Sequence, residues 1–318
     1  MTDELEPRTV PSRPVRTGQA LAGGVTAREL AGPLWQRLHH GVHVDALLDR
    51  SDPDLRIAAA AAVLPAGAAI GGWAALRVLG ARELDGRAGP GGSMLLPVTV
   101  CVGRSGRIRP RPGILLDRSR LDDGDLSEAD GLTVTAGTRS CVDVALREPV
   151  ELAVGMLDVA GRSGVARLER VRDRVLGTTR RRGLLRARVA VTLADGRSKS
   201  VPESVLKVVW VLEAGLTRPL VNRTLVDEDG FALGEPDLLD LEAALVAEYD
   251  GATHRELRSH TGDNAREEAF EDHNLTVVRA TSLDLWPRRP QLVRRLLAGR
   301  ARGLARDRSR DRFWLRAA

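Results

Sequence analysis

The first patterned segment of the chain, residues 15–44, changes its hydrophobic period from helical to alternating. Residues 17–22 and 26–31 have the helical period and are separated by Gly23-Gly24. Thr26 and Glu29 form a capping box, in which Thr26 is the N-cap and Glu29 the third helical residue. The following WQRLHHGVHV run alternates as two strands around a His40-Gly41 turn. The pattern predicts helix, turn, helix and hairpin, which is the order of a winged-helix unit.

The middle of the chain mixes short helices and strands, so it predicts an α+β region. Asp52-Pro53 caps an Ala-rich helix, because proline is well suited to the first helical turn. The patterns predict helices at 52–64, 68–79, 140–147 and 150–160, strands at 98–102, 113–118 and 132–135, and a basic helical connector over 163–188.

A third pattern begins after Asp195-Gly196 and predicts a mixed α/β core. Its first helix carries apolar residues on one face and ends near Gly215. The predicted order is helix 202–214, strands 220–226, 235–239 and 244–249, helix 261–273, strand 276–280 and helix 289–299.

These patterns divide the 318 residues into six segments, and the overall class is α/β (α+β). The predicted segments are a lead-in at 1–14, a winged-helix-like unit at 15–44, an α+β domain at 45–162, a basic connector at 163–195, a mixed-sheet domain at 196–299 and a basic tail at 300–318.

Positive charge is concentrated at the C-terminal end of the chain. Residues 288–318 contain eleven arginines and two acids, a net charge of +9, whereas the whole chain carries +5 and the remainder therefore −4. Clustered arginines suit contacts with phosphate groups, and a solvated helix face is the alternative interpretation. Charge alone does not decide between DNA binding and a solvated helix face.

Other features of the composition narrow the class of protein. No run approaches the roughly 18 apolar residues of a membrane helix, and the start of the chain lacks an apolar signal core, so we expect a cytoplasmic protein without a membrane partner. Cys101 and Cys141 form no CxxC pair, which disfavours zinc and a disulfide framework. We expect both to be buried thiols.

Acidic residues gather where two predicted strands end. Asp237 lies at a strand start, and Glu248 and Asp250 lie two residues apart at the end of the next strand, where they share one face. Crowded carboxylates repel one another unless a cation lies between them, and oxygen ligands suit Mg²⁺ or Mn²⁺. Solvent-exposed strand-end carboxylates, with Asp250-Gly251 as an ordinary turn, are the alternative.

The same segment resembles the PD-(D/E)XK nucleases of the very-short-patch-repair (Vsr) type. Pro236-Asp237 is similar to the first half of that motif, and Glu248-Tyr249-Asp250 to a second half in which an acid replaces the lysine. Glu203 resembles the glutamate of that family's entry helix, and His254 follows the Asp250-Gly251 pair as it does in the family. Arg266 and the run 275–285 resemble its closing region.

The resemblance implies a restriction-endonuclease-like domain that hydrolyses DNA phosphodiester bonds with Mg²⁺ or Mn²⁺. It implies Glu203, Asp237 and Glu248 as metal ligands, Asp250 as a residue shaping the site, and His254 as general base or leaving-group acid, unless His254 only forms a strand-end hydrogen bond. We expect backbone contacts to DNA from four arginines, Arg266, Arg279, Arg306 and Arg308.

One departure from the nuclease pattern keeps a second hypothesis open. No lysine follows Glu248 at the usual spacing, although Lys207, one turn beyond Glu203, is a possible substitute. The missing lysine favours a non-catalytic DNA-binding regulator, such as an antitoxin with a toxin partner. The retained acids, Glu203, Asp237, Glu248 and Asp250, disfavour it.

The N-terminal 15–44 resembles the winged helix of the abortive-infection (AbiEi) antitoxins, and 45–160 resembles the domain that follows it in such proteins. The capping box and LHHGVHV carry this similarity. His39, His40 and His43 suggest metal binding only weakly, because a strand places only some of them on one face, so an exposed wing is the favoured interpretation.

Overall fold

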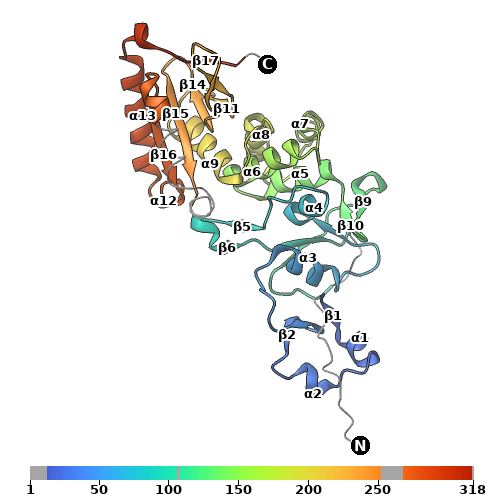
Figure 1. Ribbon diagram of the computed structural model, residues 1–318. Helices are drawn as coiled ribbons and strands as arrows, with labels where there is room; N and C mark the ends of the chain where they lie inside the picture. Colours follow the sequence, from blue (N-terminus) through green and yellow to red (C-terminus); the bar gives the residue numbers. More distant parts are fainter. Residues whose placement is uncertain (1–12, 105, 107, 252–267, 317–318) are drawn as a thin grey trace, which may run out of the picture. The chain divides into compact units, whose positions relative to one another are not determined.

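A computed structural model describes residues 13–104, 106, 108–251 and 268–316 of the chain (Figure 1). The described residues form two compact units. The first comprises those of Met1–Arg87 and Leu95–Ser140, and the second those of Ala88–Met94 and Cys141–Ala318. The second unit therefore contains the helices of the predicted connector together with the predicted C-terminal domain. The elements are mixed α/β, which confirms the predicted fold class.

The predicted order of helix, turn, helix and hairpin is present at the start of the first unit. Its elements are β1 (Val15–Arg16), α1 (Thr17–Ala22), α2 (Ala27–Leu30), β2 (Trp35–His39) and β3 (Val42–Asp45), with the strands in the order β1-β3-β2. The capping box is formed as predicted, since Thr26 Oγ1 accepts from Glu29 N at 3.2 Å and Glu29 Oε2 accepts from Thr26 N at 2.6 Å. Gly41, at φ +76°, closes the β2–β3 hairpin.

A five-stranded sheet in the order β8-β7-β4-β10-β9 forms the core of the first unit. Its strands are β4 (Ala69–Gly71), β7 (Val98–Cys101), β8 (Ile114–Asp117), β9 (Leu126–Ala129) and β10 (Leu132–Thr135). The helices beside it in the chain are α3 (Pro53–Ala61) and α4 (Gly72–Val78), and the short helix η2 (Asp123–Asp125) precedes β9. The segment with β5 (Arg87–Ala88), η1 (Pro90–Gly92) and β6 (Met94–Leu95) crosses the division between the units, and η1 belongs to the second.

One prediction in this region is wrong, because the helix expected at 68–79 begins with a strand. Ala69–Gly71 pairs with the residues of β7, and only from Gly72 does the chain become helical. Gly72 has φ +61°, which allows the turn between the two. Pairing with a distant strand therefore overrides the helical preference of an Ala-rich run.

Helices dominate the first part of the second unit. They are α5 (Gly137–Arg147), which runs through the division between the units, α6 (Val150–Arg162), α7 (Leu168–Leu176), α8 (Leu184–Leu193), α9 (Val201–Val208) and the π-helical turn η3 (Val209–Glu213). Helix α6 packs against α8 and α9.

Cys101 and Cys141 are both buried, as predicted, and burial raises the pKa of Cys141 to about 12.

The second unit also contains a four-stranded mixed sheet in the order β11-β14-β15-β16. Its strands are β11 (Leu220–Val221), β14 (Leu238–Asp240), β15 (Leu245–Asp250) and β16 (Thr276–Thr281). Strand β15 is antiparallel to β14 and parallel to β16, which is an edge strand. The strand predicted at 220–226 is interrupted at Asn222, whose φ of +47° turns the chain out of β11.

Two apolar clusters lie on opposite faces of this sheet. Leu238, Leu245 and Ala247 pack with α9 and with α13 (Arg289–Leu304), whereas Leu239 and Val246 pack on the other face. Helix α12 (Ser282–Leu285) joins β16 to α13. The alternation of the strands therefore decides which side chains at the strand ends share a face.

The segment predicted as a basic tail, 300–318, contains the end of a helix and two further elements. Helix α13 continues to Leu304, and the chain then forms η4 (Arg308–Arg310) and β17 (Trp314–Leu315). Strand β17 pairs with β12 (Leu225–Val226), which also pairs with β13 (Ala232–Gly234). In the part of the chain that the structure describes, no helix combines the length and apolar character needed to cross a bilayer.

Candidate metal centre

Antiparallel pairing brings Asp237 opposite Glu248 at one end of the four-stranded sheet. Leu238 pairs with Ala247, so continuing the register by one residue places Asp237 beside Glu248. The carboxylate of Asp237 accepts a hydrogen bond from Tyr249 N, with Oδ2 at 2.7 Å. Glu248 is buried, and alternation places Glu248 and Asp250 on the face that also carries Val246. The register therefore places Asp237, Glu248 and Asp250 at one end of the sheet.

Glu203 lies near the same end of the sheet, and its carboxylate has a capping role that was not predicted from the sequence. Ser200 is the N-cap of α9, and Glu203, at the third helical position, returns the interaction. Its Oε1 accepts from Ser200 Oγ at 2.9 Å, and its Oε2 accepts from Lys199 N at 2.7 Å. A third donor, Asn222 Nδ2, lies 3.2 Å from Oε2. Three hydrogen bonds leave this carboxylate little capacity for a further partner.

Asn222 connects Glu203 to Asp237. While its Nδ2 donates to Glu203, its backbone N donates to the carbonyl oxygen of Asp237 at 3.2 Å. Its Oδ1 is buried and has no hydrogen-bond partner within the described residues. A buried acceptor of this kind needs a donor or a cation, because leaving it unpaired costs about 1–3 kcal/mol. No motif in the sequence indicated Asn222. It lies near Asp237 because it follows β11 directly.

The donor set at this end of the sheet suits a hard cation. Asp237, Glu248 and Asp250 supply carboxylates and Asn222 supplies an amide oxygen, which are the ligand types of Mg²⁺ and Mn²⁺. Among the described residues, oxygens of Glu203, Asp237 and Glu248 do not all lie within 4.8 Å of one another. Nor do oxygens of Asp237, Glu248 and Asp250 all lie within 4.8 Å of one another. The register places Asp237 beside Glu248, and Glu203 contacts Asn222.

Lys207 is not a substitute for the lysine of the nuclease motif, contrary to that interpretation of the sequence. Its side chain is fully buried, and Nζ donates to Asp158 Oδ2 at 2.7 Å and to Asp195 Oδ1 at 3.0 Å. Ser204 Oγ donates to the same Asp158 oxygen at 2.6 Å. The other Asp158 oxygen accepts from the N–H groups of Asp195 and Gly196. Lys207 thus joins helices α6 and α9 to the Asp195 turn.

The ion pair with Lys207 controls the ionisation of Asp195. Burial acts to raise the pKa of this carboxyl, but the charge of Lys207 and its hydrogen bond outweigh burial and lower the pKa below its ordinary value. Arg218 adds a further ion pair at 3.3 Å. The Asp158–Lys207–Asp195 cluster is therefore a charged structural network.

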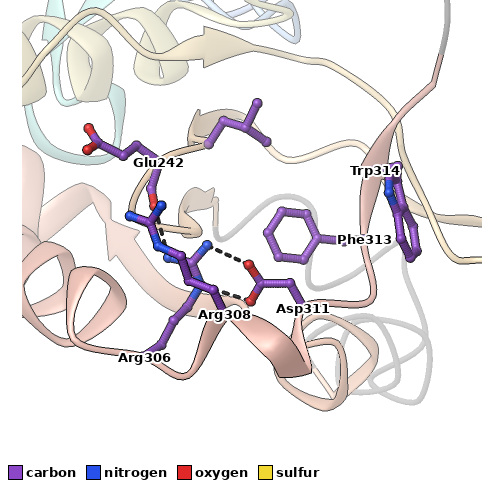
Figure 2. Close-up of a pocket in the computed structure, with 7 residues that line it drawn as sticks. Glu242, Arg306, Arg308, Asp311, Phe313 and Trp314 are labelled. Carbon is purple, nitrogen blue, oxygen red and sulfur yellow. Dashed lines mark hydrogen bonds and ion pairs between the residues drawn. The ribbon is translucent and has the colours of Figure 1, made fainter.

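Arg306, which the sequence assigned to DNA contact, holds the C-terminal segment in place (Figure 2). Its guanidinium pairs with Asp311 at 2.8 Å and donates to the carbonyl oxygens of Glu242 and Gly303. Burial acts to raise the pKa of Asp311, but hydrogen bonds from Arg306 and Asn274 lower it below its usual range. Phe313 is buried beyond this pair. The guanidinium of Arg306 therefore makes its contacts within the folded unit.

We expect Arg306→Gln to lower the free energy of unfolding by about 2 kcal/mol, because it removes charge-assisted hydrogen bonds from a largely buried site. Urea unfolding followed by circular dichroism measures the effect. Arg308→Gln is the matched control, since Arg308 is exposed, and should change stability by less than about 0.5 kcal/mol. Equal stability of the two variants would contradict the docking role.

The remaining predicted residues fall in different places. Arg279 lies on β16 in register with Glu248, and Arg308 lies on η4 at the rim of an open hollow shown in Figure 2. His254 and Arg266 lie outside the described residues. In the hairpin, His39 and His43 are partly buried, and burial is the largest cause that lowers the pKa of each.

The chain was compared with protein-family models, curated proteins and solved structures, and none of them matches it. The similarity to nuclease and antitoxin families therefore rests on the motifs of the sequence alone.

Proposed function

We propose that the second unit is a metal-dependent DNA endonuclease whose cation is held by Asp237 and Glu248. The observation that carries the proposal is the buried, unpaired side-chain oxygen of Asn222, whose backbone N–H donates to the carbonyl oxygen of Asp237. A purely structural strand end has no need of adjoining carboxylates next to an unsatisfied acceptor, whereas a hard-cation site uses both. When bound, Mg²⁺ or Mn²⁺ supplies an activated water and stabilises charge on the phosphate.

The residues of this chain have distinct tasks in the proposed reaction. Asp237 and Glu248 bind the cation, and the Tyr249 N–H fixes the orientation of the Asp237 carboxylate. Glu203 orients Asn222, so it is a positioning residue. Asp250 shapes the site from the end of β15. Proton transfer is assigned to His254 only by the resemblance to the nuclease family. Arginine side chains contact the sugar–phosphate backbone of the substrate.

Asn222 gives a prediction that does not depend on activity. Asn222→Gly should weaken Mn²⁺ binding about 10–100-fold, the usual cost of losing a ligand's supporting group, and glycine tolerates the positive φ. The measurement is the Mn²⁺ dependence of the thermal unfolding temperature. Asn274→Gly, at φ +69° beside the C-terminal segment, is the control for the backbone effect. If both variants keep the Mn²⁺ response of the wild type, Asn222 has no part in a cation site.

A second candidate function is non-catalytic DNA binding by a regulator or antitoxin. Two observations favour it: Lys207 belongs to the buried network with Asp158 and Asp195, and the carboxylate of Glu203 is occupied by three donors. Incubating the wild type with duplex and single-stranded DNA in Mg²⁺, Mn²⁺ or EDTA separates the two functions. Cleavage only with the cation supports the nuclease; binding without cation-linked stabilisation or cleavage supports the regulator.

A further inference from the structure

Helix α13 carries five arginines and no acid, and the structure divides the arginines into two groups. Arg289 and Arg300 are paired within the unit, with Glu151 at 3.2 Å and Asp240 at 3.0 Å respectively. The other three, Arg294, Arg295 and Arg302, are exposed. Of these three, Arg295 also pairs with Asp284, and Arg294 and Arg302 have no ion-pair partner among the described residues.

The exposed arginines form one stripe along α13, which we call the arginine stripe: Gln291, Arg294, Arg295, Ala298 and Arg302. Their spacings of three and four residues place them on one helix face. The opposite face is buried through Leu292, Leu296, Gly299 and Gly303.

The two glycines of the buried face explain how closely α13 approaches the sheet. A Cβ atom on Gly303 would lie 1.8 Å from the carbonyl oxygen of Ala243, and one on Gly299 would lie 2.9 Å from Leu245 Cδ1. This contact fixes the rotation of the helix about its axis, so the stripe is held at the side of the sheet.

The arginine stripe and edge strand β16 line a common open hollow of about 510 Å³. The strand contributes Val277, Val278 and Arg279, and no acidic residue lines the hollow. Arg295 is fixed by Asp284 at 2.7 Å and by the carbonyl oxygen of Arg279 at 2.9 Å. For Arg294 and Arg302 the described part of the chain offers no ion-pair partner. The hollow therefore presents two cations that are available to an external anion.

We propose that this hollow binds the sugar–phosphate backbone of DNA, with Arg294 and Arg302 each contacting a phosphate. Eight residues of helix separate these arginines by about 12 Å. A DNA strand rises about 3.4 Å per nucleotide along its axis, so the two contacts lie about three to four nucleotides apart. Two arginines at this distance match an extended chain of regularly spaced phosphates.

The position of the hollow connects it to the candidate metal centre, so the inference rests on the proposed function. Arg279 is the register neighbour of Glu248 across β15 and β16, and neighbouring strands lie about 4.8 Å apart. Arg295 contacts Arg279 at this same strand end, and Arg302 lies farther along the helix. A strand bound along the stripe thus runs from the carboxylate end of the sheet outward.

The test compares the full-length wild type with Arg294→Gln/Arg302→Gln for binding of a labelled duplex in EDTA, so that no cleavage occurs. Each lost phosphate contact reduces the slope of log K against log salt by about 0.9, and the double variant by about 1.8. At about 0.1 M salt this corresponds to an affinity loss of about 60-fold. The control is the double variant Arg167→Gln/Arg170→Gln, which replaces two exposed arginines on or next to α7. It removes the same charge from the same unit and should retain most of the affinity.

The same two variants are also titrated with polyglutamate, as a model of an acidic polypeptide. Three outcomes would overturn the inference: an unchanged salt slope in the stripe variant, an equal loss of DNA affinity in the α7 control, or a stripe variant that loses polyglutamate binding but keeps its DNA affinity. The last would assign the arginine stripe to an acidic polypeptide. The failure of the proposed function is recognised separately. If the wild type never cleaves DNA with Mg²⁺ or Mn²⁺ but the stripe variant loses binding as expected, the nuclease proposal fails and the DNA-binding hollow is supported.

Discussion

Asp237→Ala should reduce DNA cleavage to the level seen without added cation. Asp237 is expected to bind the ion that makes water nucleophilic, and no neighbouring side chain can take its place opposite Glu248 without moving the strand. DNA binding in EDTA should remain within about twofold of wild type, because the contacts with the backbone come from arginines rather than from this carboxylate. Cleavage assays and binding measurements on one preparation test both parts.

The structure also changes what this substitution should do to stability. Removing one of several close carboxylates relieves repulsion, but Asp237 accepts a hydrogen bond from Tyr249 N, and its loss costs about 1 kcal/mol. Asp237→Asn keeps an acceptor while removing the charge, so it should be inactive and as stable as wild type without metal. Asp229→Asn, in the exposed turn after β12, is the control. If Mn²⁺ raises the unfolding temperature of Asp237→Asn as much as that of wild type, Asp237 is not a ligand.

Elements whose signals are local could be predicted from the sequence. The Thr26–Glu29 capping box and the His40-Gly41 hairpin each depend on residues a few positions apart, and both are present. Elements whose structure depends on a distant partner could not be predicted. Ala69–Gly71 is a strand because β7 pairs with it, and the C-terminal segment folds because β17 finds β12 about ninety residues earlier in the chain.

The candidate site shows the same division. Strand alternation was sufficient to place Glu248 and Asp250 on one face, and the antiparallel pair then brings Asp237 to Glu248. The roles of Glu203 and Asn222 could not be predicted, because the capping box of α9 and the left-handed turn at Asn222 meet only in the folded chain. Lys207 was considered for catalysis because its helix position is visible in the sequence, whereas its partner Asp158 lies 49 residues away.

Lys207→Met should be the most destabilising single substitution among those considered. Asp158 and Lys207 are both fully buried, and removing one partner of a buried ion pair costs about 3–5 kcal/mol because the other charge is left uncompensated. Asp195 loses the same partner, although Arg218 still contacts it. Urea unfolding at neutral pH measures the loss, and Lys199→Met, at a partly exposed pair with Glu235, is the matched control with a loss of less than about 1 kcal/mol.

The pH dependence identifies the cause of the loss. Lys207 lowers the pKa of Asp195, so the stability from this pair is fully present above the unfolded pKa of about 3.9 and is lost as the pH falls through the lower folded pKa. In Lys207→Met, burial acts on Asp195 with one cation fewer and favours its protonated form at a higher pH. The stability difference between wild type and variant should therefore be largest at neutral pH. It should shrink as the pH falls through the raised pKa of Asp195 in the variant toward its lower folded pKa in the wild type. A difference that stays constant with pH would show that the lysine contributes by packing its methylene chain, since packing does not depend on protonation.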